Sequence, residues 1–294
     1  MSRSYPVRIP SDPAPLHGTL LLPDSAGLSP ALLLVAGAGP VDRDGNLPGL
    51  ANDSLRLLAE ALADRGIATL RADKRGVGTS HAAAPDESVL RLDAYVRDAA
   101  HWLLAMCGDP HLSRVGLLGH GEGALIATLA AQVSPVDRLV LVAGAGVPAG
   151  PLILRQLVDA GMPAEQVAAA RAIIGRLLRG ETVVDVPDAL AGLFRPSVQP
   201  YVTSWLLRDP VVELVAVRCP VLVVQGMADL QVRKSDALLL AAARPSADLL
   251  LIPGVNHVLK APAEGRAANL ATYAEPLLPV AAEVADGIAA FVRP

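Results

Sequence analysis

Short apolar runs alternate with segments of helical periodicity along most of the chain. The runs expected to be strands are 5–9, 17–22, 31–36, 67–71, 114–118, 138–143, 219–224 and 249–252. The run 31–36 is continuously apolar, which is typical of a central strand covered on both faces, as in a parallel sheet. The first two runs have proline-rich connections, and we expect them to form a hairpin of edge strands.

The segments between these runs carry apolar residues at helical spacing. Helices are expected at about 53–65, 87–106, 124–131 and 236–243, with a last helix ending at Val292. In the first of them, Leu55, Leu58 and Leu62 fall on one face. Strands that alternate with helices predict an α/β fold, with a mostly parallel central sheet and helices on both faces.

The alternation stops after the sixth run and resumes at the seventh. Between them only helical stretches are evident, at 152–160, 164–178 and around 201–207. We therefore expect residues 1–146 and 216–294 to form the core domain and residues 147–215 to form an inserted helical cap, or lid. Such a cap would lie over the carboxyl ends of the strands, where open α/β sheets bind ligands, and would enclose an apolar pocket with the sheet.

A glycine-rich turn, Gly-His-Gly-Glu-Gly at 119–123, joins the fifth run to the helix that follows. Strand, Gly-x-x-x-Gly turn and helix form the context of a nucleophile elbow, whose middle residue is a serine raised clear of the sheet. Here the middle residue is Gly121, so the turn is present without its nucleophile. We expect the flanking His120 and Glu122 to pack or pair locally.

Two polar loops follow the last two predicted strands. Asp229 comes after the run 219–224, and His257 comes after the run 249–252. Each residue alone is more often a turn former than a catalyst. Their order after the elbow, however, is that of a triad in which the acid fixes the tautomer of a histidine general base. We therefore predict that Asp229 and His257 act together with position 121.

The loop after the third run is made of small residues, Gly-Ala-Gly-Pro at 37–40. Small residues let the backbone approach a substrate oxygen closely. The backbone N–H groups of Ala38 and Glu122 are the candidate donors of an oxyanion hole. Glu122 also begins a helix, whose dipole favours developing negative charge.

Other polar and aromatic residues near these loops are candidates for substrate contacts. Asp42, Arg43, Asp44 and Asn46 form a dense polar group that we interpret first as a structural hydrogen-bond cluster. Gly39 and Arg43 are retained as possible substrate-binding residues, together with Tyr201 and Trp205 of the expected cap. The apolar composition of the cap favours a small-molecule substrate with an apolar acyl or alkyl group.

Taken together, the chain resembles the lidded carboxylesterases of the α/β-hydrolase superfamily, near the proline-iminopeptidase-like and monoglyceride-lipase-like serine hydrolases. The resemblance covers nearly the whole chain and is carried by the segments 37–46, 73–80, 119–123, 226–232 and 256–257. The elbow of that family reads Gly-His-Ser-Glu-Gly, so Gly121 departs from it. The resemblance implies ester hydrolysis with Asp229 and His257 as catalytic residues, but no acyl-enzyme can form through Gly121.

Three functions are compatible with this departure. The first is that of a carboxylester or thioester hydrolase whose nucleophile has been replaced, by mutation or natively. Alternatively, it is a native enzyme without the serine that uses His257 and Asp229 as a general base for cyclisation, isomerisation or lyase chemistry. The third function is that of a binding protein without turnover. The sequence leaves the three open.

Charge and composition narrow the remaining classes of partner. The net charge is −4 with no basic block, which does not favour nucleic acid as a partner. The longest apolar runs, 31–38 and 139–146, are too short to span a bilayer, and residues 1–6 open no signal-peptide core, so cytoplasm is the expected location. Cys107 and Cys219 make no metal-binding spacing and are expected to be buried free thiols. We expect no metal and no cofactor.

Overall fold

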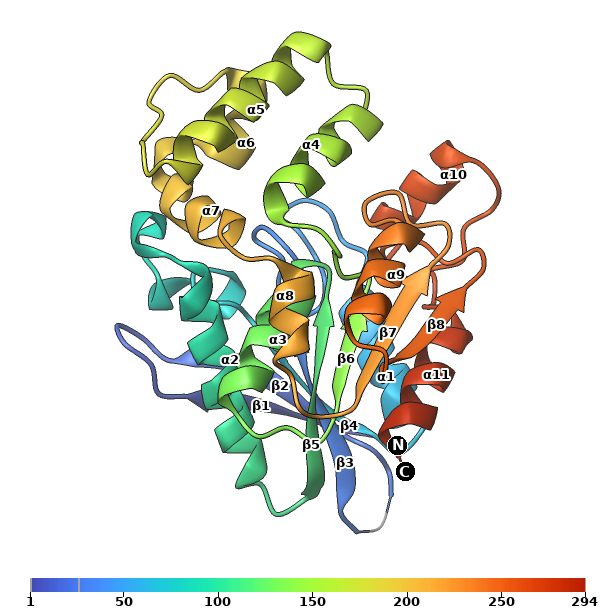
Figure 1. Cartoon of the computed structure of the whole chain (residues 1–294). Helices are drawn as coiled ribbons and strands as arrows, with labels where there is room; N and C mark the ends of the chain where they lie inside the picture. The colour runs from blue at the N-terminus through green and yellow to red at the C-terminus, as the bar shows by residue number, and fades with distance from the viewer. Residues whose placement is uncertain (1, 26, 294) are drawn as a thin grey trace.

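A single eight-stranded sheet organises residues 2–25 and 27–293, the part of the chain that the computed structural model describes. The strands lie in the order β1-β2-β4-β3-β5-β6-β7-β8 (Figure 1). Their bounds are β1 (Arg3–Ile9), β2 (Leu16–Leu22), β3 (Ser29–Val35), β4 (Ala68–Ala72), β5 (Leu112–His120), β6 (Leu139–Val142), β7 (Val221–Gly226) and β8 (Asp248–Ile252). The β1–β2 and β2–β4 pairs are antiparallel, whereas β4 to β8 pair in parallel. The mostly parallel α/β sheet is therefore confirmed.

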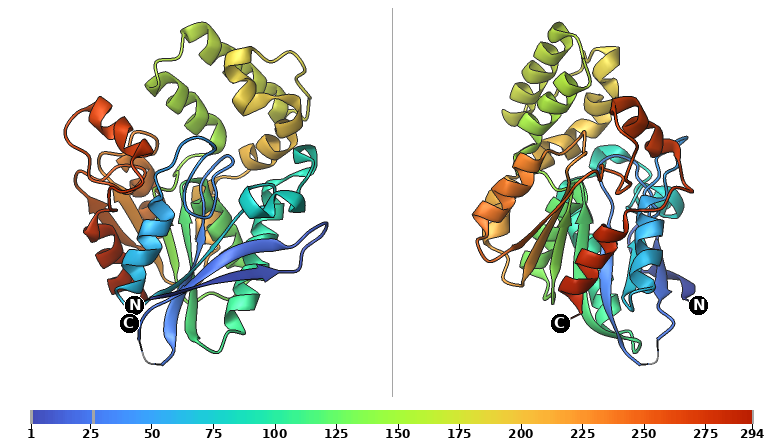
Figure 2. Two further views of the ribbon diagram at one scale, coloured as in Figure 1. Left: turned by 180° about the vertical axis from the view of Figure 1, so that it is seen from behind. Right: turned by 90° about the vertical axis from the view of Figure 1, so that its right-hand side faces the viewer.

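Helices cover both faces of this sheet (Figure 2). One face packs against α1 (Ser54–Ala63) and α11 (Ala282–Val292). The other packs against α2 (Leu92–Cys107), α3 (Glu122–Val133), α8 (Pro210–Val215) and α9 (Lys234–Ala243). A further short helix, α10 (Arg266–Ala271), lies in the connection between β8 and α11. Short 3-10 helices occur at Gly78–Ala83, Glu87–Val89, Pro196–Val198 and Thr272–Ala274.

The apolar run of β3 shows why the central strands are uniformly hydrophobic. Successive side chains of a strand point to opposite faces of the sheet. Leu33 and Val35 enter the cluster under α2 and α3, while Leu32 and Leu34 enter the cluster under α1 and α11. Both sets are buried, so no position of this strand can be polar without a partner.

The helical segment between β6 and β7 contains α4 (Ala149–Asp159), α5 (Ala164–Leu178), α6 (Asp188–Phe194) and α7 (Gln199–Leu206) before α8. These four helices surround an apolar cluster of their own, above the carboxyl ends of the strands (Figure 1). Phe194 is fully buried in that cluster. The last helix, α8, packs instead against α3 and α9. Across the described residues, no helix is both long and apolar enough to cross a membrane.

Two expectations about the elements are wrong. Strand β2 is not an edge strand, because β4 pairs with it on the side opposite to β1. The helix expected over 87–106 is interrupted, because Leu90 and Arg91 have extended backbones between the 3-10 turn and α2. Helices α6 and α8 were not anticipated, because six or seven residues are too few to show a clear period.

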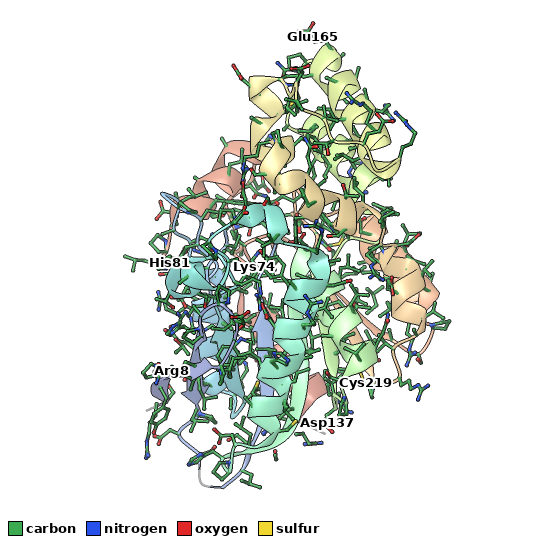
Figure 3. The ribbon with its side chains drawn as sticks, turned by 90° about the vertical axis from the view of Figure 1, so that its left-hand side faces the viewer. Arg8, Lys74, His81, Asp137, Glu165 and Cys219 are labelled. Atoms are coloured by element: carbon green, nitrogen blue, oxygen red, sulfur yellow. The ribbon has the colours of Figure 1, made fainter. Side chains whose placement is uncertain are left out.

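The expectation of buried cysteines also fails. Cys107 is exposed at the end of α2, Cys219 is half-buried just before β7, and both are free. Figure 3 shows Cys219 beside Asp137, far below the helical segment that carries Glu165 and well away from Lys74. Burial raises the pKa of the Cys219 thiol. Neither cysteine lies at the carboxyl ends of the strands.

Candidate functional site

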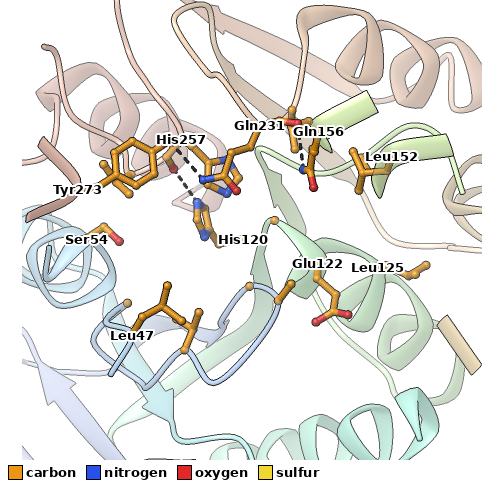
Figure 4. Close-up of a pocket in the computed structure, with 18 of the residues that line it drawn as sticks. Leu47, Ser54, His120, Glu122, Leu125, Leu152, Gln156, Gln231, His257 and Tyr273 are labelled. Carbon is orange, nitrogen blue, oxygen red and sulfur yellow. Dashed lines mark hydrogen bonds between the residues drawn. The ribbon is translucent and has the colours of Figure 1, made fainter. Parts of the chain in front are cut away.

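Four loops meet at the carboxyl ends of the central strands. They follow β3, β5, β7 and β8 and carry Ala38, Gly121, Asp229 and His257, respectively. A cavity of about 170 Å³ opens there, lined by Ala38, Gly121, Glu122 and His257 among others (Figure 4). Asp229 lies behind His257 and is almost wholly buried. The predicted residues are thus brought to one place.

Gly121 has the backbone of a sharp turn. Its φ is 58° and its ψ is −121°, a region that residues with a side chain rarely adopt. The turn is fixed by hydrogen bonds from Gly121 N–H to Val142 O (3.0 Å) and from Ala124 N–H to Gly121 O (3.1 Å). A Cβ built on Gly121 would lie 3.5 Å from His257 Nε2, its nearest neighbour. The space beside Gly121 therefore accepts a side chain, and that side chain would face His257.

The outer glycines of the same turn are different. A Cβ on Gly119 would lie 2.1 Å from the carbonyl oxygen of Gly123, and a Cβ on Gly123 would lie 2.2 Å from that of Val35. These distances are far inside van der Waals contact, so packing of the strand against α3 requires glycine at both positions. At Gly121 only the backbone dihedral angle favours glycine.

His257 and Asp229 form a hydrogen-bonded pair, with His257 Nδ1 donating to Asp229 Oδ2 at 2.8 Å. The other carboxylate oxygen accepts from the backbone N–H groups of Gln231 (2.7 Å) and Val232 (2.9 Å). Burial opposes ionisation of Asp229, but His257 and these backbone donors hold the pKa of the carboxyl below its usual value. An ionised Asp229 keeps the imidazole proton on Nδ1 and leaves the lone pair of Nε2 free on the side of Gly121.

The two loops that carry this pair are bonded to each other. Met227 N–H donates to Ile252 O at 2.9 Å, and Ala228 N–H donates to Val255 O at 2.8 Å. A Cβ on Gly226 would lie 2.3 Å from the oxygen of Val255, so the close approach needs glycine at the end of β7. This contact sets the distance between the acid and the histidine.

His120 supports the same loop from the elbow. Its Nε2 donates to the backbone oxygen of His257 at 2.8 Å, and the two ring centroids are 4.7 Å apart (Figure 4). Burial and, to a lesser extent, the neighbouring His257 together lower the pKa of His120 to about 4. His120 is therefore neutral near pH 7, and the expected local pairing of this residue is confirmed.

The backbone N–H groups of Ala38 and Glu122 are free to bind a substrate oxygen. Neither donates to another residue in the described part of the chain. The buried ammonium of Lys74 donates to the carbonyl oxygens of Gly37 and of Gly39, the latter at 2.7 Å, and so holds the backbone on both sides of Ala38. Burial lowers the pKa of Lys74, and the nearby Glu122 counteracts that shift.

Glu122 also has a buried carboxyl group. Its Oε1 accepts from Tyr201 Oη at 2.6 Å, which confirms the expected local pairing. Its Oε2 has no partner within residues 2–25 and 27–293. Burial raises the pKa of Glu122, although Lys74 and Tyr201 oppose the shift. A single residue thus supplies a candidate oxyanion donor and an unpartnered carboxyl oxygen.

A second cavity of about 440 Å³ adjoins the first. Ala38, Glu122 and Trp205 line both cavities, so the two meet at the candidate oxyanion hole. Gly39 and Tyr201, which were predicted to contact substrate, line the second cavity. The site therefore consists of two adjacent cavities that share part of their lining.

Arg43 lies apart from both cavities. Its side chain donates to Asp73 Oδ2 (2.6 Å) and Thr19 Oγ1 (3.1 Å), and it also bonds Thr79. Nearby, Asn46 Oδ1 accepts from the backbone N–H groups of Asn52 and Asp53, both at 2.8 Å. The structure thus shows a hydrogen-bond cluster in this loop. Arg43 lines neither of the two cavities.

Several lining residues had no signal in the sequence. Gln156, Gln231 and Tyr273 line the first cavity, and they form a chain in which Gln156 Nε2 donates to Gln231 O (3.1 Å) and Gln231 Nε2 to Tyr273 Oη (3.3 Å). They come from α4, from the loop after β7 and from the 3-10 helix Thr272–Ala274, so no spacing connects them. The described residues contain no group of three or more His, Cys, Asp or Glu side chains arranged to hold a metal ion.

Comparisons with known proteins show similarities in sequence and in fold. The sequence model of the family described as serine aminopeptidase, S33, matches residues 48–261, a span that includes Gly121, Asp229 and His257. Esterase EstD from Thermotoga maritima is 28% identical over 254 residues, which are 83% of this chain and 58% of that protein. The chain therefore spans less than two thirds of the length of this relative.

Solved structures share the fold at lower identity. Est1E from Butyrivibrio proteoclasticus superposes with a TM-score of 0.60 and 17% identity, covering 97% of this chain and 99% of that one. The structure of DcsB in complex with its substrate analogue gives a TM-score of 0.65 and 19% identity, covering 99% and 98%. At these identities the likeness establishes the fold alone.

Proposed function

Because the chain belongs to the serine aminopeptidase, S33, family of α/β-hydrolases, we propose that its site is that of a carboxylester or thioester hydrolase with Gly121 at the position of the nucleophile. The likeness to an esterase supports this class of reaction. The observation that carries the proposal is the 3.5 Å between His257 Nε2 and a Cβ built on Gly121. A hydroxyl one bond beyond that Cβ is within reach of the base.

With a serine at position 121, the residues of the site could carry out hydrolysis through an acyl-enzyme. The hydroxyl oxygen attacks the acyl carbon while its proton passes to His257 Nε2, and the N–H groups of Ala38 and Glu122 hold the oxygen that becomes negative. His257 then gives the proton to the leaving oxygen or sulfur as the bond to the acyl carbon breaks. Water then attacks the acyl-enzyme and gives its proton to His257 Nε2. The bond between the acyl carbon and the serine oxygen breaks, and His257 returns the proton to that oxygen.

With Gly121, the covalent step is absent and only general-base chemistry remains. A water molecule beside Gly121 can give a proton to His257 Nε2 and attack the carbonyl held by the same two N–H groups. The apolar lining of the first cavity, with Leu47, Leu125 and Leu152, suits the hydrocarbon part of an ester. The helical segment 147–215 would act as the lid over this cavity.

The test compares the unchanged chain, Gly121→Ser and Gly121→Ala on short- and medium-chain aryl esters and thioesters. Alanine imposes the same backbone restriction as serine but has no hydroxyl, so it is the matched control. We expect Gly121→Ser to raise the rate by several orders of magnitude and Gly121→Ala to leave it unraised. Adding His257→Ala to the serine variant should lower the rate by about 10²–10⁴-fold. Equal rates for the serine and alanine variants would refute the proposal.

A second candidate is proton abstraction from the substrate itself, supported by the open space between Gly121 and His257 Nε2. In that reaction, the oxyanion donors would hold an enolate rather than a tetrahedral intermediate. Exchange of acyl α-protons of a thioester in D₂O, followed by NMR on the unchanged chain, would reveal it. The exchange should disappear in His257→Ala. Ligand binding that survives in His257→Ala, without exchange or product in either protein, would instead indicate a binding protein.

A further inference from the structure

The second cavity is lined by one side chain with an unpartnered carboxyl oxygen, Glu122. Its other charged side chains are already paired: Lys74 with two carbonyl oxygens, Arg75 with Asp98, and Glu87 with Arg195. Among the acidic and basic side chains that line this cavity, only the buried Glu122 has an atom, Oε2, that is both buried and without a partner in the described residues. An unpaired buried carboxyl oxygen is costly, so a hydrogen-bond donor on a ligand would be bound strongly there.

The chemistry of the site assigns this cavity to the acyl side of the substrate. His257 must reach the leaving oxygen or sulfur to protonate it, so the leaving group lies on the side of His257, in the first cavity. The second cavity is not lined by His257 and begins at Ala38 and Glu122, where the carbonyl oxygen would be held. The acyl chain extends from that carbonyl away from the leaving group and enters the second cavity.

The donor that fits Glu122 Oε2 is a hydroxyl rather than an ammonium group. The positive charge of Lys74 lies in the same cavity and disfavours a second cation. Lys74 uses two of its three N–H donors on Gly37 and Gly39, so it can donate its third to an oxygen. A hydroxyl can donate to a carboxyl oxygen and accept from an ammonium at once, which an alkylammonium cannot do.

We propose that the second cavity binds an acyl chain bearing a hydroxyl group close to its carbonyl carbon, and that Glu122 Oε2 accepts a hydrogen bond from that hydroxyl. The assignment to the acyl side depends on the hydrolase function proposed above. Because Glu122 holds the carbonyl oxygen through its N–H and the hydroxyl through its carboxyl group, the two substrate groups are only a few bonds apart. Glu122 is then the residue that determines specificity for hydroxyacyl substrates.

The test measures binding to the unchanged chain by isothermal titration calorimetry with N-acetylcysteamine thioesters of three acyl groups. The three acyl groups are hexanoyl, 3-hydroxyhexanoyl and 3-methoxyhexanoyl, and because both enantiomers of the hydroxy compound are used, four compounds are measured. The methoxy compound keeps the oxygen but removes the donor. We expect one enantiomer of the hydroxy compound to bind at least tenfold more tightly than the other two acyl groups. Equal dissociation constants for all compounds, or equal binding of the hydroxy and methoxy compounds, would overturn the inference.

A variant then tests whether Glu122 is responsible. Glu122→Gln keeps the shape of the side chain and an oxygen for Tyr201, but it places an NH₂ group where Oε2 lies. We expect the preference for the hydroxy compound to fall to about twofold or less. A preference that remains tenfold in a folded Glu122→Gln protein would overturn the inference, and if that variant does not fold, the ligand series on the unchanged chain decides alone.

The two proposals fail separately in these measurements. If Gly121→Ser hydrolyses the hexanoyl thioester but the hydroxyl brings no gain in affinity, the hydrolase function stands and the hydroxyacyl inference is wrong. If the hydroxy compound binds more tightly but Gly121→Ser hydrolyses none of these thioesters, the cavity is identified and the hydrolase function is wrong.

Discussion

His120 is a buried base held between the elbow and the loop of the candidate catalytic histidine. The residue is 7% exposed, and its Nε2 donates to the backbone oxygen of His257. A protonated imidazole in this place would be poorly solvated and would lie against a second histidine ring. The neutral form is therefore the one that the folded protein accommodates.

This preference predicts a dependence of stability on pH. The pKa of His120 is about 4 in the folded protein, against roughly 6.5 when unfolded. Its contribution is therefore complete above about pH 6.5 and is lost as the pH falls towards 4, by at most about 3 kcal/mol. Denaturant unfolding between pH 4 and 7.5 measures it, with His120→Gln as the control because its amide can still donate to His257 O. The unchanged protein should lose more free energy of unfolding than the variant over this range, and parallel curves would show that His120 is not responsible.

At the scale of single residues, the sequence indicated the positions but not all of their partners. Strand ends and chain order were enough to bring Asp229 and His257 together, because loops that follow parallel strands meet at one edge. The side chain of Glu122 was not assigned to a cavity, because its partner Tyr201 lies on α7, in the segment with no strand pattern. The partners of Lys74 could not be identified from the sequence, because they are backbone carbonyl groups, which leave no mark in a sequence.

At the scale of elements, the junction of β5 and α3 depends on three glycines with different roles. Gly119 and Gly123 allow the turn to pack against neighbouring backbone, whereas Gly121 has room for a side chain but a positive φ of 58°. The junction can therefore accept a residue at its centre at the cost of strain, but not at its flanks. This is the arrangement expected of a turn that presents a side chain.

Alanine substitutions should separate these roles. We expect Gly121→Ala and Gly121→Ser to remain folded, with the free energy of unfolding lowered by about 1–3 kcal/mol through backbone strain. Gly123→Ala should be destabilised more, because its Cβ would lie 2.2 Å from the oxygen of Val35 and the strand or helix must move. Denaturant unfolding of the three variants compares them. A Gly123→Ala protein as stable as Gly121→Ala, or a serine variant more stable than the unchanged chain, would contradict this account.

Strands with both faces buried were predicted correctly from the sequence, whereas breaks and pairings that do not change the apolar pattern were missed. Strand β3 was evident because both of its faces are covered. The interruption at Leu90 and Arg91 was not evident, because the apolar spacing of 87–106 continues through it. The sequence also gave no sign that β4 pairs with β2, since pairing between strands distant in the chain is not a local property.

At the scale of the molecule, the helical segment between β6 and β7 is joined to the sheet-bearing part by polar contacts of two kinds. Arg155 of α4 bonds Asp236 of α9 at 2.6 Å, and the Asp236 carboxylate is fully buried. Arg195, next to α6, bonds Glu87 at 2.7 Å, where both side chains are substantially exposed. A buried charge depends on its partner far more than an exposed one does, so these two contacts should not hold the segment equally.

Methionine in place of each arginine removes the charge and keeps the apolar stem. Arg155→Met leaves the buried Asp236 carboxylate with only the backbone N–H groups of Gly146 and Arg233, at 3.1 and 2.9 Å, so we expect a loss of about 1.5–3 kcal/mol in the free energy of unfolding. Arg195→Met, the matched control, should cost about 0–1 kcal/mol, because its pair with Glu87 is solvated.

Denaturant unfolding measures the loss in the free energy of unfolding for each variant. Limited proteolysis, read as the rate of cleavage within 147–215, reports local opening of the segment. Faster cleavage in Arg155→Met than in Arg195→Met would show that the buried pair holds the segment over the cavities. Equal losses in the two variants would mean that Asp236 is satisfied by its backbone donors and that apolar packing of α7 and α8 keeps the segment in place.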